Sequence, residues 1–271
     1  MIHLVLEYAG HGSLWRWIQH HGALKEKRAK RVFGQLAGAL AHCHSHEVIH
    51  RDIKPENVLV CDASASRVLL SDFGSSTRCG PKEKLRGECG THAYMPPEMS
   101  LAKGYGHAAD LWSLGMTLFY MLAGQHPFDD PFRPRSAEQL KALACAGRFE
   151  FPARLTKPAL DLLHGLLNQK PAARPRALQL AKHPWCAEFY IGPREAGEEE
   201  EKVLRAAACE QCGKLGLDSS VLRESLEAGK KNYLTVAHSL IVASMRAQGG
   251  KLVQEPEPAP LPNGDGKVET A

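Results

Sequence analysis

The sequence predicts an α+β fold that is mainly helical, with a small helical module after it. Apolar residues recur at helical spacing over long stretches, whereas the β-branched runs that favour strands are only a few residues long. The chain has 271 residues, of which 44% are hydrophobic and 24% are charged, as in ordinary globular proteins. This length accommodates one large domain and one small domain.

The expected elements follow from these patterns. Helices are expected at 13–19, 26–45, 109–123, 136–145, 157–168 and 177–182, and strands at 2–6, 58–60 and 68–70. Residues 26–45 carry a single apolar stripe, which predicts a helix packed on one side. Residues 109–123 are apolar on all faces, which predicts a central buried helix that ends at Gly124. At about 17 residues, with Asp110 and Ser113 inside it, this helix is not expected to span a membrane.

Charge and cysteine usage exclude several function classes. The net charge is +4 and the basic residues are dispersed, so the sequence does not predict nucleic-acid binding. The eight cysteines are scattered and no apolar signal peptide follows Met1, which predicts reduced thiols in a cytoplasmic or nuclear protein. Cys209 and Cys212 have the spacing of a zinc knuckle, but no second pair completes four ligands. Two cysteines on one helix are the simpler interpretation.

Two short segments carry the chemistry. Residues 50–57 read His-Arg-Asp-Ile-Lys-Pro-Glu-Asn, and residues 72–74 read Asp-Phe-Gly. Phosphoryl transfer needs a carboxylate that accepts a hydroxyl proton, oxygen ligands for Mg²⁺ and a cation on the migrating group. Asp52, Asn57 and Asp72 could provide the oxygen atoms for this chemistry.

These segments closely resemble the catalytic and metal-binding loops of eukaryotic serine/threonine protein kinases. The resemblance implies transfer of the γ-phosphoryl group of ATP to protein Ser or Thr hydroxyls. It implies that Asp52 is the base, that Lys54 contacts the terminal phosphate, and that Asn57 and Asp72 hold Mg²⁺. It also implies that His50 is structural, because Asp52 already occupies the position of the base.

The same resemblance assigns binding roles outside these loops. The backbone of Glu7 and Ala9 would hold adenine, although a plain edge strand is the alternative for this stretch. Thr91 would bridge Asp52 and Lys54. An acidic residue in the substrate groove often selects basic residues upstream of the target hydroxyl, so Glu56 would favour substrates with Arg or Lys before the target Ser or Thr.

Further residues are expected to support the site. The resemblance implies that Asp110 accepts hydrogen bonds from the backbone of the catalytic loop and that Glu98 forms a buried ion pair with Arg174. Arg51 pairs in such kinases with a phosphate on the activation loop, which the resemblance places at residues 75–95, but Gly87 stands where the phosphorylated threonine is usual. One hypothesis is that Glu88 provides a fixed negative charge toward Arg51, and the alternative is that Glu88 is merely solvated.

The domain organisation is predicted from composition and resemblance together. Residues 1–186 resemble the hinge and large (C-terminal) lobe of calcium/calmodulin-type and AMP-activated-type kinases, and residues 187–202 form an acidic linker. Residues 203–246 resemble the ubiquitin-associated-like module of microtubule-affinity-regulating and sperm motility kinases. Intramolecular docking of this module is favoured over ubiquitin binding. Residues 247–271 contain alternating prolines and are expected to be disordered.

The expected small lobe is largely absent from the sequence. No Gly-x-Gly-x-x-Gly loop precedes residues 50–57, and no strand lysine is found to hold the α- and β-phosphates. The chain is therefore expected to be a fragment, an internally initiated product or a divergent form. The alternative to a kinase is a catalytically inactive, kinase-like scaffold or regulatory binding module.

Overall fold

The chain divides into two compact units in the computed structural model. One unit contains Tyr8–Arg194, and the other combines Met1–Glu7 with Glu195–Ala271. The structure describes residues 6–128, 135–190, 198–228, 234–235, 237–239 and 241–242. Of the strand expected at 2–6, only Leu6 lies among the described residues, and it is not in a strand. The tail at 247–271 lies outside them.

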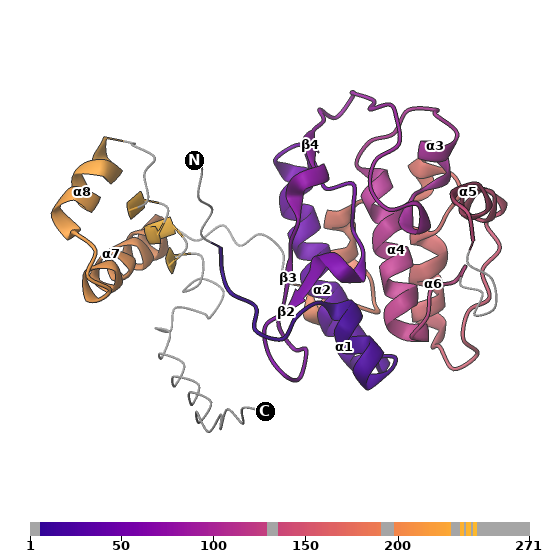
Figure 1. Cartoon of the computed structure of the whole chain (residues 1–271), viewed down its shortest axis with the longest axis horizontal. Coiled ribbons are helices and arrows are strands. Elements are labelled where there is room, and N and C mark those ends of the chain that lie inside the picture. Colours follow the sequence, from indigo (N-terminus) through magenta and orange to yellow (C-terminus); the bar gives the residue numbers. More distant parts are fainter. Residues whose placement is uncertain are drawn as a thin grey trace, which may run out of the picture. The chain divides into compact units, whose positions relative to one another are not determined.

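The larger unit is mainly helical (Figure 1). Its α-helices are α1 (Leu14–His21), α2 (Glu26–Ser45), α3 (Pro97–Ser100), α4 (Ala108–Ala123), α5 (Ala137–Ala146) and α6 (Lys157–Leu166). Its strands are β1 (Val48–Ile49), β2 (Val58–Val60), β3 (Val68–Leu70) and β4 (Thr77–Arg78). Its 3₁₀ helices are η1 (Pro55–Asn57), η2 (Phe73–Ser75), η3 (His92–Tyr94), η4 (Pro171–Ala173), η5 (Ala177–Lys182) and η6 (Ala187–Phe189). The predicted α+β, mainly helical class is confirmed for these residues.

Helix α4 lies at the centre of the larger unit. All of its residues from Ala109 to Leu122 are buried, and it packs on both α2 and α6. Gly115 permits the close approach to α6, because a Cβ atom there would lie 2.9 Å from side-chain atoms of Leu166 and Leu167. At the C-terminus, Gly124 has φ 79° and donates its N–H to the carbonyl of Tyr120. The predicted central helix and its glycine stop are therefore present.

Two small antiparallel sheets place the two motif segments side by side. Strand β2 pairs with β3, with Val58 opposite Leu70, and β1 pairs with β4, with Ile49 opposite Thr77. Because β1 ends at Ile49 and β2 begins at Val58, the segment 50–57 connects the first sheet to the second. The segment 71–76 connects β3 to β4 and so returns from the second sheet to the first. Both motif loops therefore run between the same two pairs of strands.

Some predicted boundaries match the structure and others differ from it. The helix at 26–45 and the strands at 58–60 and 68–70 have the predicted bounds. The helix predicted at 157–168 ends at Leu166, and residues 177–182 form a 3₁₀ helix. Ser136 lies before its helix as the N-cap and accepts a hydrogen bond from the backbone N–H of Gln139.

The smaller unit contains α7 (Glu198–Lys214), α8 (Ser219–Glu227) and short helical stretches at 234–235, 237–239 and 241–242. Helix α7 starts inside the predicted acidic linker, so the part of the linker from 198 onward is helical. Cys212 is fully buried against Leu222 and Leu234 and forms part of this unit's core. Among the described residues, no three His, Cys, Asp or Glu side chains are grouped to hold a metal ion, and no helix is long and apolar enough to cross a membrane.

Candidate active site

Asp52 lies at the centre of a dense set of hydrogen bonds. One carboxylate oxygen, Oδ1, accepts the backbone N–H of Thr91 at 3.0 Å and the Thr91 hydroxyl at 2.8 Å. The other, Oδ2, accepts the Lys54 ammonium at 2.8 Å and the Asn57 amide at 3.0 Å. The side chain of Lys54 also donates to Thr91 Oγ1 at 2.7 Å. The structure thus brings together four residues that are spread over 40 positions of sequence.

These contacts keep the Asp52 carboxyl ionised. Burial by itself would raise its pKa, but the hydrogen bonds from Lys54 and Thr91, the Lys54 charge and the Asn57 amide outweigh burial. Together they lower the pKa of Asp52 below its ordinary value. A carboxylate that is ionised at neutral pH and held in one orientation is suited to accept a proton from a hydroxyl group.

Asn57 and Asp72 are suitable oxygen ligands for Mg²⁺. The side-chain amide nitrogen of Asn57 donates to both the backbone carbonyl and the carboxylate of Asp52. The side-chain oxygen of Asn57 therefore faces away from Asp52. Ser71 donates its backbone N–H, at 2.9 Å, and its hydroxyl, at 2.8 Å, to the backbone carbonyl oxygen of Asn57, and Asp72 is the next residue along the chain. The Asp72 side chain is exposed, and carboxylate and amide oxygens are donors that this hard cation accepts. The residues therefore fit a magnesium ion.

Asp110 fixes the backbone of the catalytic loop. Its two carboxylate oxygens accept the N–H groups of His50, at 2.9 Å, and Arg51, at 2.8 Å. The carboxylate is fully buried in α4, and His44 lies 2.8 Å from its Oδ2 atom. Arg51 has φ 69°, a strained backbone conformation for a residue other than glycine. Such a conformation persists only where surrounding contacts restrain it. The two hydrogen bonds to Asp110 supply that restraint.

His50 occupies a structural position. It is fully buried, its Nε2 lies 3.0 Å from the carbonyl oxygen of Ser71, and its ring packs edge-on against Phe73. Its Nδ1 accepts the backbone N–H of Asp52 at 3.3 Å. These contacts connect the two motif loops through His50.

Gly90 is a functional position that the sequence reasoning missed. It has φ 87°, and a Cβ atom there would clash with the carbonyl oxygen of Arg51. Only glycine allows the activation loop to approach the catalytic loop this closely. The close approach places Thr91, the next residue, against Asp52. The available sequence signal was the glycine directly before that threonine.

The buried pair of Glu98 and Arg174 is present. The Arg174 guanidinium donates to both carboxylate oxygens, at 2.7 and 2.8 Å. It also donates to the carbonyls of Ala108 and Asn168, at 2.8 Å each, and lies over the Trp112 ring. The pair therefore connects the residues after the activation loop to α4 and to the end of α6.

The hypothesis that Glu88 faces Arg51 is wrong. Glu88 lies 2.7 Å from the Lys141 ammonium and 3.4 Å from the His92 ring. The Arg51 side chain donates instead to the carbonyl of Ser75 at 2.5 Å and to the hydroxyl of Tyr105 at 3.4 Å. Glu88 thus ties the activation loop to α5, a contact over 53 positions of sequence that spacing rules could not indicate.

Neutralising Glu88 with a Glu88→Gln substitution is expected to lower the free energy of unfolding by about 1 kcal/mol at most, because exposed ion pairs contribute little. The loss should fade in about 1 M salt, which screens surface charges. Urea unfolding at low and high salt measures both effects. A loss above about 2 kcal/mol, or one independent of salt, would contradict this assignment.

Three further site residues lie at or near the surface. Glu56 and Glu7 are exposed and Ala9 is half-buried. Their predicted roles stay predictions.

Comparison with known proteins identifies the family. A protein kinase domain model matches residues 1–186. The chain belongs to the protein kinase family. Mouse sperm motility kinase 3A is 31% identical over 242 residues, which cover 89% of this chain and 47% of that protein. Mouse sperm motility kinase 2B is 31% identical over 242 residues, covering 89% of this chain and 49% of that protein.

A relative of another kind is also similar. Mouse Aurora kinase C is 37% identical over 187 residues, which cover 69% of this chain and 65% of that protein. The chain spans about half the length of the sperm motility kinases that it matches. These relatives support the assignment of this chain, by family, as a serine/threonine protein kinase.

Proposed function

We propose that this chain carries the catalytic residues of a serine/threonine protein kinase that transfers the γ-phosphoryl group of ATP. The observation that carries the proposal is the set of hydrogen bonds around Asp52. A carboxylate, an ammonium group and a threonine hydroxyl are held within 3.0 Å of one another by the catalytic and activation loops. A buried carboxylate with a lysine at this distance is arranged for charge development on a phosphoryl group.

The roles of the residues follow from this geometry. Asp52 orients the substrate hydroxyl and accepts its proton, and Lys54 holds a positive charge beside the oxygens of the migrating group. Thr91 keeps both side chains in place. When bound at Asn57 and Asp72, magnesium neutralises charge on the phosphates of ATP.

Finer assignments are part of the proposal. Because Glu56 is an exposed acid beside the catalytic residues, we expect substrates with Arg or Lys before the target Ser or Thr. Within the family we assign the chain to the calcium/calmodulin and AMP-activated-related group, and residues 203–246 to a ubiquitin-associated-like module that docks within the same protein. The cytoplasm is the proposed location, with the nucleus as the alternative.

The test is transfer of phosphate from ATP and Mg²⁺ by the full chain to three peptides. One has arginines before a serine, one has acids before the serine, and one has tyrosine in place of serine. Transfer is expected to the basic serine peptide above the other two. A matched chain with Asn57→Ala and Asp72→Ala should transfer none.

Equal transfer to the serine and tyrosine peptides would contradict the proposed specificity. If the folded chain transferred phosphate to none of the peptides, the proposal would fail, and a kinase-like binding module would be the better description.

A further inference from the structure

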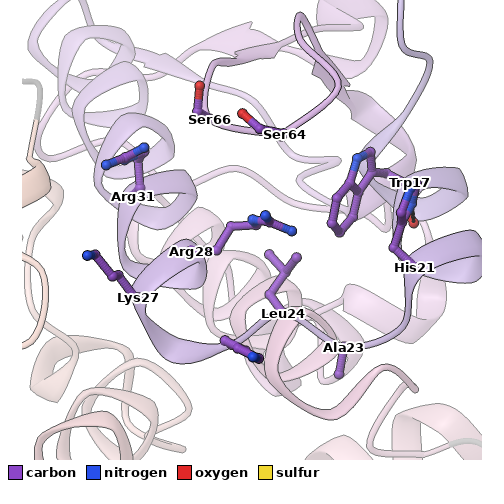
Figure 2. Close-up of a pocket in the computed structure, with 10 residues that line it drawn as sticks. Trp17, His21, Ala23, Leu24, Lys27, Arg28, Arg31, Ser64 and Ser66 are labelled. Atoms are coloured by element: carbon purple, nitrogen blue, oxygen red, sulfur yellow. Dashed lines mark hydrogen bonds between the residues drawn. The ribbon is translucent and has the colours of Figure 1, made fainter.

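A hollow on the larger unit, away from Asp52, is lined by basic and aromatic side chains (Figure 2). It has a volume of about 570 Å³ and is formed by the end of α1, the start of α2 and the loop between β2 and β3. Its lining residues are Trp17, His21, Ala23, Leu24, Lys25, Lys27, Arg28, Arg31, Ser64 and Ser66. Four of these are cations and none is an acid. We propose that this hollow is a docking site for an acidic segment of a partner protein.

The floor of the hollow is apolar and held in place. Trp17 and Leu24 are buried, and the His21 ring is stacked on Trp17 with ring centroids 4.2 Å apart. The indole N–H of Trp17 donates to the carbonyl of Ala63 at 3.3 Å, which fastens the β2–β3 loop to α1. The floor is therefore a fixed apolar surface against which one apolar side chain of an occupant would pack.

The cations stand over this floor. Figure 2 shows the Arg28 side chain directed toward Trp17, and its guanidinium carbon lies 5.0 Å from the ring centroid. Lys25, Lys27 and Arg31 are exposed on the same side of α2. No ion pair with a described carboxylate is found for any of these four side chains. Their charge is therefore available to an anionic partner.

The nearby acids are already engaged. Glu26, the acid in the first turn of α2, accepts hydrogen bonds from the backbone and hydroxyl of Thr156, both at 2.8 Å, and from the Trp185 indole at 3.0 Å. Asp62 accepts five hydrogen bonds from its own loop, from Ser64, Ser66 and Arg67. These bonds outweigh burial and hold the Asp62 pKa well below its ordinary value. Neither carboxylate forms an ion pair with the four cations.

The cluster is unfavourable for the helix that carries it. Lys27 and Arg31 are four residues apart on α2, and like charges at this spacing repel. Lys25, Lys27 and Arg28 also lie at the N-terminus of α2, where the helix dipole favours anions, and Lys25 makes no capping hydrogen bond with its side chain. Carboxylates of an occupant would relieve both effects.

The length of the surface favours a peptide over a small anion. A second hollow of about 740 Å³ shares Leu24, Lys25 and Lys27 with the first and continues past Lys30 and Arg154. Glu26 and Glu188 also line it, so its positive field is weaker. An extended segment would place its acids in the first hollow and run on into the second.

The experiment measures binding of a fluorescein-labelled peptide to the full chain by fluorescence anisotropy. The peptide consists of Asp and Glu around one central Leu. An Arg28→Glu/Arg31→Glu chain is expected to bind it at least about tenfold more weakly, because two attractions become repulsions. A Lys103→Glu/Lys170→Glu chain has the same change in net charge at exposed positions outside both hollows and should bind within about twofold of the unmodified chain.

Several outcomes test the proposed docking site. A milder Arg28→Gln/Arg31→Gln chain, checked by circular dichroism, must also lose affinity, which separates lost recognition from lost folding. Equal binding by both double variants, or equal binding of a Gln and Asn version of the peptide, would overturn the proposal. Tighter binding of RNA or of anionic lipid vesicles that depends on Arg28 and Arg31 would overturn it too. The Asp52→Asn chain should bind the peptide unchanged, so failure of the kinase assay and failure of docking remain distinguishable.

Discussion

An Asp52→Asn substitution is expected to lower kcat/KM for phosphoryl transfer by about 10²–10⁴-fold, the usual contribution of a positioned base. Asparagine keeps the shape of the side chain but cannot accept the proton. Its amide would also turn a donor toward Lys54, Asn57 or Thr91, all of which donate to the carboxylate. The measurement is steady-state kinetics with the basic serine peptide. An Asp161→Asn chain is a charge-matched control, since that side chain is 81% exposed and remote in sequence from both motif loops.

The pH dependence provides an independent check on Asp52. Because its pKa is lowered in the folded protein, the carboxylate stays ionised as the pH falls toward about 3.9, the ordinary value for aspartate. Its contribution to stability is likewise present above that pH and lost only on further acidification. Protonation of Asp52 should therefore not limit activity near neutral pH.

An Asp52→Asn chain that kept more than a tenth of the activity would show that another group accepts the proton.

Local chemistry was readable from the sequence because the motif residues lie within a few positions of one another. The roles of Asp52, Lys54 and Asn57 were predicted from the resemblance of segment 50–57 to a kinase catalytic loop, and the β-branched run at 58–60 predicted the strand that follows it. The central helix was also predictable, since its apolar residues cover every face. These features depend on short-range patterns, which are the part of a fold that periodicity describes.

Contacts over long stretches of chain were less accessible. One hypothesis placed Glu88 toward Arg51 and the alternative left it solvated, but Glu88 pairs with Lys141 on α5. The basic hollow is formed by three segments, and only its charge pattern at Lys25, Lys27, Arg28 and Arg31 is visible in the sequence. Its aromatic floor depends on how α1 packs against the β2–β3 loop. Periodicity carries no information about such packing, because it is decided by side-chain shape.

Replacing Arg174 with methionine is expected to lower the free energy of unfolding by about 3–5 kcal/mol, because Glu98 would keep a buried charge with no partner. The Arg174 side chain is fully buried and the Glu98 side chain is 6% exposed. The carbonyls of Ala108 and Asn168 would also lose the hydrogen bonds that Arg174 donates. Urea unfolding, followed by the fluorescence of the tryptophans, measures the change for the larger unit.

A double variant separates the unpaired charge from the loss of packing. With Glu98→Gln added to Arg174→Met, no buried charge remains, so the double variant should be more stable than Arg174→Met alone. Recovery will be incomplete, since methionine cannot donate to Ala108 and Asn168 or lie as a cation over the Trp112 ring. If the double variant were less stable than Arg174→Met, the cost would arise from the hydrogen bonds and the ring contact and not from the stranded carboxylate. The comparison therefore shows whether the charge of Glu98 or the other contacts of Arg174 contribute more to the stability of the junction between the activation loop and α4.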